Sequence, residues 1–255
     1  MAQIISIINN KGGTGKTTTT LNLGSALQKS GYKVLVIDID SQSNLTSSLG
    51  VSKVENHIGK LLLNDINAND VIINKNGNVS LIPSTNYLLD YEYKLNNEPG
   101  REYLLKEALE PIKSNYDYIL IDCGPSLGTF SINAIVASDY YIVPMQAENF
   151  AFIGLDKIIQ ISDKVKMRMN PNLEMAGILF VKFPHRTKFS KAVIKSLETN
   201  TRFKEKVFKT RIRTDISLME STAFGKDVFE YAPNSRGADD YLKLAKEFIQ
   251  KYGDK

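Results

Sequence analysis

Short runs of apolar, mostly β-branched residues alternate along the chain with longer stretches in which apolar positions follow helical spacing. The strand-like runs are Ile4–Ile8, Val34–Ile39, Tyr118–Ile121, Tyr140–Val143 and Gly177–Val181, and the first helical stretch is Thr17–Ser30. Near-continuous apolar runs of this length are typical of parallel strands buried on both faces. The pattern predicts an α/β fold with a doubly wound, mostly parallel sheet and helices on both faces.

Two segments in the middle of the chain carry weaker signals. Asn76–Gly77 lies between two apolar runs and predicts a hairpin-type turn or a short connection. Glu98–Gly100 contains proline and glycine and breaks the chain before a helix that we expect from Arg101 to Lys113. No repeat or low-complexity linker divides the sequence, so residues 1–255 are expected to form a single domain.

The segment Ala238–Tyr252 carries its apolar residues close to one helical face. This pattern predicts a terminal helix packed on the core, although a helix lying on a membrane surface has the same periodicity. The acidic residues Asp239, Asp240 and Glu247 argue against an anionic bilayer as the partner of this helix.

Composition narrows the class of protein. The chain has 255 residues, of which 42% are hydrophobic and 24% charged, a balance typical of a globular domain. It has no apolar run of membrane-spanning length and no charged leader, so we expect a cytoplasmic protein without a membrane partner. The single cysteine, Cys123, excludes an internal disulfide, and the net charge of +4 permits a polyanionic partner without requiring one.

The segment Asn10–Thr18 lies between the first strand-like run and the first helical stretch and is rich in glycine and lysine. Glycines allow the backbone N–H groups to point at phosphate oxygens, and the start of the helix adds its positive dipole end. In this geometry Lys16 neutralises the β and γ phosphates of a nucleotide and the Thr17 hydroxyl holds Mg²⁺. The expected nucleotide-binding residues are Lys11, Gly12, Gly13, Thr14, Gly15, Lys16, Thr17 and Thr18.

Three aspartates lie at the ends of predicted strands near this segment: Asp38, Asp40 and Asp122. Carboxylates at strand ends beside a phosphate loop are well placed to hold the water shell of a metal ion and the attacking water. The expected metal site therefore consists of Thr17, Asp40 and Asp122. An aspartate at a strand end can instead cap a helix or form a turn, and this alternative stays open, most of all for Asp38.

The segment Lys11–Thr17 resembles the deviant Walker A motif of the ParA/MinD ATPases, which are P-loop NTPases. The resemblance implies that ATP closes a sandwich homodimer in which Lys11 reaches the partner's phosphates. It also implies catalytic roles for Lys11, Lys16 and Asp40 in Mg²⁺-dependent hydrolysis of ATP to ADP and phosphate, with Asp40 orienting the attacking water.

Two further segments resemble the switch regions of that family. Val34–Asn44 is similar to the second strand and first switch, and Tyr118–Ser126 to the Walker B strand and second switch. The chain departs from the family at Ser41 and Gly124, where prolines are common, and Gly124 is expected to loosen the second switch. No guanine-recognition signature occurs, which favours ATP over GTP, and the resemblance implies a base-contacting loop near Lys182–Pro184.

From Asn170 onward the similarity narrows to the short, Soj-like form of ParA, on motifs such as Leu218–Ser221 and Phe224–Lys226. This resemblance implies a motor for the partitioning of DNA or another cargo. The ATP dimer would bind nonspecific double-stranded DNA at the nucleoid. A ParB-like or other cargo-adaptor protein would stimulate hydrolysis and release the dimer.

A basic stretch in the last third of the chain supplies candidate phosphate contacts. Nonspecific DNA binding requires lysines and arginines directed at the backbone. The candidate DNA-binding residues are Arg186, Lys188, Lys204, Lys206, Lys209, Arg211 and Arg213. A solvated helical face is the alternative reading of such a stretch. One arginine that the family uses for DNA falls at Ser217, so that contact is missing here.

Three other functions share the P-loop chemistry and stay open at this point. A MinD-like positioning ATPase would bind a membrane surface. A biosynthetic enzyme of the same superfamily, which activates a carboxylate or forms an amide with ATP, would need a pocket for a small substrate. A scaffold that binds ATP without hydrolysing it would release no phosphate.

Overall fold

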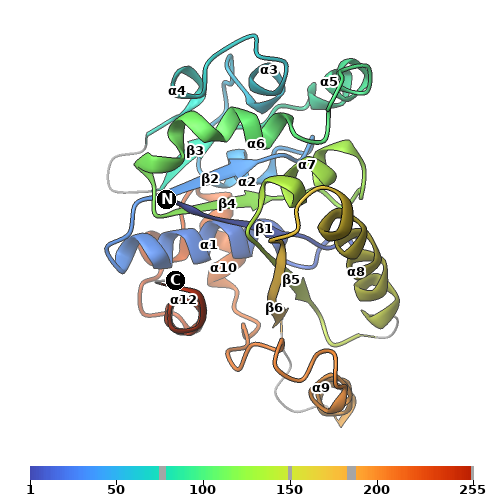
Figure 1. The fold of residues 1–255 in the computed structure, drawn as a ribbon. Helices are drawn as coiled ribbons and strands as arrows, with labels where there is room; N and C mark the ends of the chain where they lie inside the picture. Colours follow the sequence, from blue (N-terminus) through green and yellow to red (C-terminus); the bar gives the residue numbers. More distant parts are fainter. Residues whose placement is uncertain (75–78, 149–150, 183–187, 254–255) are drawn as a thin grey trace.

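The computed structural model describes residues 1–74, 79–148, 151–182 and 188–253. One sheet contains the strands β1 (Gln3–Ile7), β2 (Val34–Asp38), β3 (Ser80–Ile82), β4 (Tyr118–Asp122), β5 (Tyr140–Met145) and β6 (Glu174–Phe180). The strand order is β3-β2-β4-β1-β5-β6, and every neighbouring pair is parallel (Figure 1). The predicted parallel α/β fold is therefore confirmed.

Helices lie on both faces of this sheet (Figure 1). In chain order they are α1 (Lys16–Lys29), α2 (Asn44–Ser48), α3 (Ile58–Leu62), α4 (Ala68–Val71), α5 (Leu88–Leu95), α6 (Leu104–Leu109), α7 (Thr129–Ala137), α8 (Ala151–Arg168), α9 (Lys188–Thr199), α10 (Ser217–Ala223), α11 (Val228–Tyr231) and α12 (Arg236–Tyr252). Of these, none combines the length and apolarity that crossing a bilayer requires, within the part of the chain that the structure describes.

Successive strand residues enter two separate hydrophobic cores, because side chains alternate between the faces of a sheet. In β1, Ile4 packs into the core that also holds Leu105 and Ile158, whereas Ile5 packs into the core that holds Leu27 and Phe248. The strands have few polar residues because both of their faces are covered.

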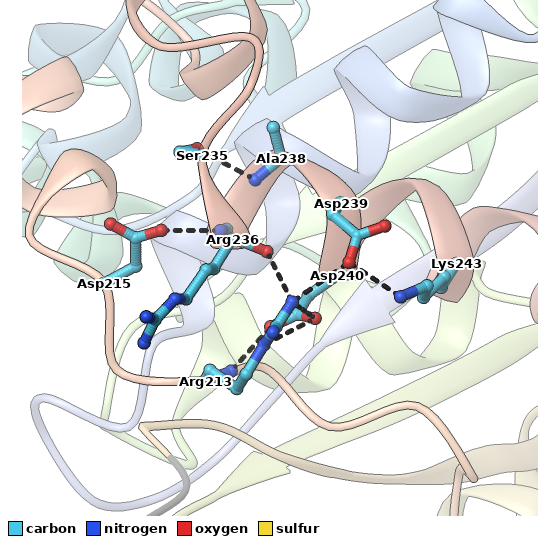
Figure 2. Close-up of polar contacts among 9 residues, drawn as sticks. Arg213, Asp215, Ser235, Arg236, Ala238, Asp239, Asp240 and Lys243 are labelled. Carbon is cyan, nitrogen blue, oxygen red and sulfur yellow. Dashed lines mark hydrogen bonds and ion pairs between the residues drawn. The ribbon is translucent and has the colours of Figure 1, made fainter.

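The terminal helix α12 packs on the core, as the sequence predicted, with Tyr241, Leu244 and Phe248 fully buried. Its neighbour there is α1. Helix α12 begins two residues earlier than expected. The reason is its cap, since the Ser235 hydroxyl accepts a hydrogen bond from the Ala238 amide at 3.2 Å (Figure 2).

The helix expected from Arg101 to Lys113 is wrong in extent. Only Leu104–Leu109 is α-helical, and Glu110–Asn115 continues as a 3₁₀-helix. Gly100 has a left-handed φ of 68°, and Pro111 lacks the amide that an α-helix would need at that position. The predicted turn at Asn76–Gly77 lies outside the described residues.

Candidate nucleotide site

The loop between β1 and α1, residues 8–15, runs over the carboxyl edge of the sheet, and we call it the P-loop. Gly13 and Gly15 have φ values of 73° and 79°, in the left-handed region that favours glycine. A Cβ atom added at Gly12 or Gly13 would meet no atom within 4 Å. The outer side of the loop is therefore open to a ligand.

Side chains from the loop and from the end of β5 fix the P-loop. The Asn9 amide donates to the Pro144 carbonyl at 2.7 Å, and its oxygen accepts from the Lys11 backbone amide at 3.0 Å. The Gln146 side chain donates to the Gly13 carbonyl at 2.9 Å. The sequence analysis missed Gln146, since no motif marks it. These contacts hold the loop in shape without occupying its open side.

The start of α1 offers unsatisfied positive charge. Its N-cap, Gly15, has no side-chain capping bond, and no acidic residue lies in the first turn. Such an end binds anions through free amides and the helix dipole. Lys16 is only 7% exposed, burial lowers its pKa, and its Nζ donates to the neutral Lys11 carbonyl at 3.2 Å. A buried ammonium without a tight carboxylate partner is suited to a phosphate.

Thr17 and Asp122 form the next part of the site. The Thr17 hydroxyl donates to Asp122 Oδ2 at 2.7 Å, while Asp122 Oδ1 is buried with no hydrogen-bond partner among the described residues. Burial, followed by the neighbouring Asp38, raises the pKa of Asp122 well above its usual range. An orphaned carboxylate oxygen beside a hydroxyl fits a hydrated Mg²⁺ ion, which prefers oxygen ligands.

Asp38 is fully buried and is committed to the backbone. Its carboxylate accepts from the Thr46 amide at 2.9 Å, from the Thr46 hydroxyl at 2.7 Å and from the Asp40 amide at 3.1 Å. Burial raises the pKa of Asp38 to about 6. At this position the turn-forming alternative describes the structure, because Asp38 anchors α2 and the loop that carries Asp40.

Asp40 lies against the segment that follows β4. The Gln42 amide donates to Asp40 Oδ1 at 3.1 Å, and the Ser84 hydroxyl donates to the Asp40 carbonyl at 2.7 Å. A Cβ atom added at Gly124 would lie 3.1 Å from Asp40 Oδ1. The absent side chain at Gly124 therefore leaves room for the Asp40 carboxylate, whereas a proline there would force it to move.

Lys11 is exposed and forms an ion pair with Glu148, in the segment after β5. Both side chains are about half exposed, and ion pairs in that setting contribute little to stability. Glu148 had no signal in the sequence. The structure holds Lys11 only weakly, and its action on a partner's nucleotide stays a prediction.

A cavity of about 190 Å³ opens beside the P-loop. It is lined by Gly15, Thr18, Val181, Lys182, Ile212, Arg213, Thr214, Asp215, Leu218, Met219 and Tyr241. The sequence analysis expected the base-contacting loop near Lys182, which lines the cavity, while residues 183 and 184 lie outside the described ranges. The contribution of residues 212–219 was missed, because only the fold brings that segment to the loop.

The predicted DNA-binding residues do not form one uniform surface. Lys204 and Lys209 are exposed, and Lys206 is half-buried. Lys188 begins α9, but its side chain is not described, and Arg186 lies outside the described residues. Arg211 pairs with Glu198 at 3.6 Å.

Arg213 is the clearest departure from a DNA-facing side chain. Its guanidinium binds Asp240 at 2.7 to 3.0 Å and Asp239 at 3.0 Å, both on α12 (Figure 2). Hydrogen bonding to Asp240 raises the pKa of Arg213 further. Arg213 thus ties residues 212–215, which line the cavity, to the terminal helix.

Comparison with known proteins places these features in a family. A family model described as an AAA domain matches residues 2–175. The sporulation initiation inhibitor protein Soj of Bacillus subtilis is 43% identical over 97% of this chain and 98% of its own length. The chromosome partitioning protein ParA of Myxococcus xanthus is 36% identical over 98% of this chain and 89% of its own.

The chain is also similar to a solved structure, that of cobyrinic acid a,c-diamide synthase from Mycobacterium smegmatis with bound ADP and magnesium. That structure has a TM-score of 0.86 and 30% identity, and the match covers 100% of this chain and 98% of that one. The match with Soj has the higher identity and also runs nearly end to end on both chains. The P-loop, the strand-end carboxylates and these similarities together show that the chain belongs to the ParA/Soj family of partition proteins, with the P-loop NTPase fold of the ParA/MinD group.

Proposed function

We propose that this chain is a Mg²⁺-dependent ATPase that forms an ATP-bound homodimer and drives the partitioning of DNA or another cargo. The observation that carries the proposal is the conjunction of an open P-loop, a buried Lys16 and an orphaned Asp122 oxygen beside Thr17. The buried ammonium of Lys16 and the unpaired oxygen of Asp122 are costly without partners, and a bound nucleotide and metal ion would supply those partners.

The residues of the site have separate roles in this proposal. The P-loop amides, the start of α1 and Lys16 hold the phosphates, and Thr18 lies at the cavity where the base would enter. Thr17 and Asp122 hold Mg²⁺, and Asp40 contributes to that site from the loop beyond β2. When bound, the metal ion supplies positive charge that offsets the charge on the phosphate oxygens during transfer.

Asp40 is also the candidate for orienting the attacking water. Its backbone is fixed by Ser84, and its carboxylate rests where a side chain at Gly124 would be. Both switch segments therefore meet at this carboxylate. A partner protein that moves either segment would change the position of Asp40, which gives partner-stimulated hydrolysis a physical route.

Membership of the family supports the proposed dimerisation, DNA binding and adaptor protein. Lys11 is exposed and weakly paired, so it is free to reach a second copy. Nonspecific double-stranded DNA, a ParB-like adaptor and a cytoplasmic, nucleoid-associated location complete the proposal. The second candidate function is that of a biosynthetic enzyme of the same superfamily, which the match to the synthase structure supports. Such an enzyme would turn over a small substrate without DNA.

Two lysine variants test the central claim. Lys16→Ala should abolish ATP binding, because the buried ammonium is removed, whereas Lys11→Ala should bind ATP and fail to dimerise. Nucleotide binding by calorimetry and mass by light scattering, with ATP and Mg²⁺ and with hydrolysis blocked, separate the two. Wild-type protein that stays monomeric under these conditions, or a Lys16→Ala variant that binds ATP normally, would contradict the proposal.

A further inference from the structure

A second cavity lies away from the P-loop, at the amino ends of β5 and β6. Its volume is about 360 Å³. The helix α8 forms one wall through Ile159, Ser162, Asp163 and Lys166, which share one helical face. The segment after α9 forms the opposite wall through Arg202, Phe203 and Lys206.

Two hydroxyl groups lie at the inner end of this cavity. Ser162 is 2% exposed, and its Oγ has no hydrogen-bond partner among the residues that the structure describes. Tyr141 is 5% exposed, and burial raises the pKa of its phenol to about 12, so the phenol keeps its proton near neutral pH. An interaction with the Ser162 side chain opposes this rise in the pKa of Tyr141, so the two hydroxyls are neighbours. Buried hydroxyls in native proteins nearly always have a partner, so the Ser162 hydroxyl, which has none within hydrogen-bond distance among the described residues, indicates a polar ligand.

The rim of the cavity carries charges of both signs with one positive charge in excess. Arg202 and Asp163 pair with each other at 2.7 Å. Lys166 and Lys206 have no ion-pair partner within the described ranges, and Glu174 is the remaining acid of the lining. The two lysines approach from opposite walls, which suits an anion that lies between them.

We propose that this cavity binds a phosphate group, with Lys166 and Lys206 providing the charge and the hydroxyls of Ser162 and Tyr141 donating hydrogen bonds from within. A tetrahedral phosphate has enough oxygens to accept from both walls and from the inner end at once, whereas a carboxylate has only two. The phosphate comes either from the DNA backbone or from a free phosphate-bearing molecule. The DNA source rests on the proposed function, and the free source does not.

The test uses the full chain and two probes, inorganic phosphate and a labelled DNA duplex of random sequence. Phosphate binding is measured by calorimetry with saturating ADP and Mg²⁺, so that the P-loop is occupied, and DNA binding by fluorescence anisotropy with ATP and Mg²⁺. The double variant Lys166→Gln/Lys206→Gln removes the two charges. Lys157→Gln/Lys164→Gln is the matched control, because both lysines are exposed on α8 and do not line the cavity.

The double variant should bind phosphate about tenfold more weakly, since charge-assisted contacts are the strong ones. Ser162→Ala should weaken phosphate binding by roughly threefold, and Glu174→Gln should strengthen it. Loss of DNA affinity with a salt slope lower by about 2 identifies the backbone as the source. Loss confined to phosphate identifies a free ligand.

The proposal is overturned if the double variant matches the control in its binding of both probes. Failure of the proposed function looks different. If wild-type protein binds neither ADP nor DNA, the P-loop stays empty during the phosphate titration. Any phosphate that it then binds is bound equally by the wild type and by the variants. The difference between the variants then still reports on the cavity.

Discussion

The P-loop and the basic stretch from Lys188 to Arg213 are both expected to bind a polyanion through basic side chains. The two regions differ in the burial and the ion pairing of those side chains. In the P-loop, Lys16 is buried and the surrounding backbone is fixed by Asn9 and Gln146. In the basic stretch, Arg211 and Arg213 are paired with acids from α9 and α12. A run of positive charge in a sequence therefore does not define a binding surface until the acids that meet it are known.

The largest change in ligand binding is expected from a variant that alters the backbone of the P-loop and leaves its charge unchanged. Gly13→Ala places a methyl group on the open side of the loop at a φ of 73°. We expect ATP affinity to fall on the order of 100-fold, or about 3 kcal/mol, because the methyl group occupies the phosphate position. Calorimetric titration with ATP and Mg²⁺ measures the change.

Gly31→Ala is the matched control for that variant. Gly31 has a φ of 95° and, like Gly13, open space around an added Cβ atom, but it lies beyond the end of α1. Both variants should lose roughly 1 kcal/mol of stability from left-handed strain. Equal ATP affinities in the two variants would show that the open side of the P-loop does not face the phosphates.

The fold and the P-loop could be predicted where the sequence itself carries the pattern, as glycines in a loop or as runs of buried apolar residues. Left-handed glycines at Gly13 and Gly15, and apolar strands that alternate between two cores, leave local traces that can be read from the chain. The parallel α/β fold and the positions of Asp40 and Asp122 at strand ends followed from those traces. Even here Asp38 needed the structure, since a strand-end aspartate that binds metal and one that anchors Thr46 look alike in sequence.

Features that depend on distant partners could not be predicted. Glu148 meets Lys11 across 137 residues, and Asp240 meets Arg213 across 27. Gly124 was expected to loosen the second switch. The structure shows instead that the missing side chain at Gly124 leaves room for the Asp40 carboxylate of a neighbouring loop. Physical proximity of this kind depends on the fold as a whole, and no local spacing encodes it.

The second prediction concerns Arg213. Arg213→Ala leaves Asp240, which is 4% exposed, without its charge partner, and should lower the free energy of unfolding by about 3 kcal/mol. Lys243→Ala breaks the exposed pair with Asp239 on the same helix and should cost less than about 0.5 kcal/mol. Denaturant titration compares the two. Unchanged stability with a large loss of DNA affinity would make Arg213 a DNA contact after all.

The smallest expected effect belongs to the exposed lysines of the basic stretch. Lys204→Gln/Lys209→Gln should leave stability unchanged, because both side chains are exposed, and should weaken binding to nonspecific DNA by roughly three- to tenfold. The matched control is Lys33→Gln/Lys106→Gln, which removes the same charge from exposed positions elsewhere. Anisotropy titrations at several salt concentrations should show a log–log slope lower by about 2 for the first pair only. Equal slopes for both pairs would mean that Lys204 and Lys209 act through net charge alone, and the basic stretch would then be a solvated face.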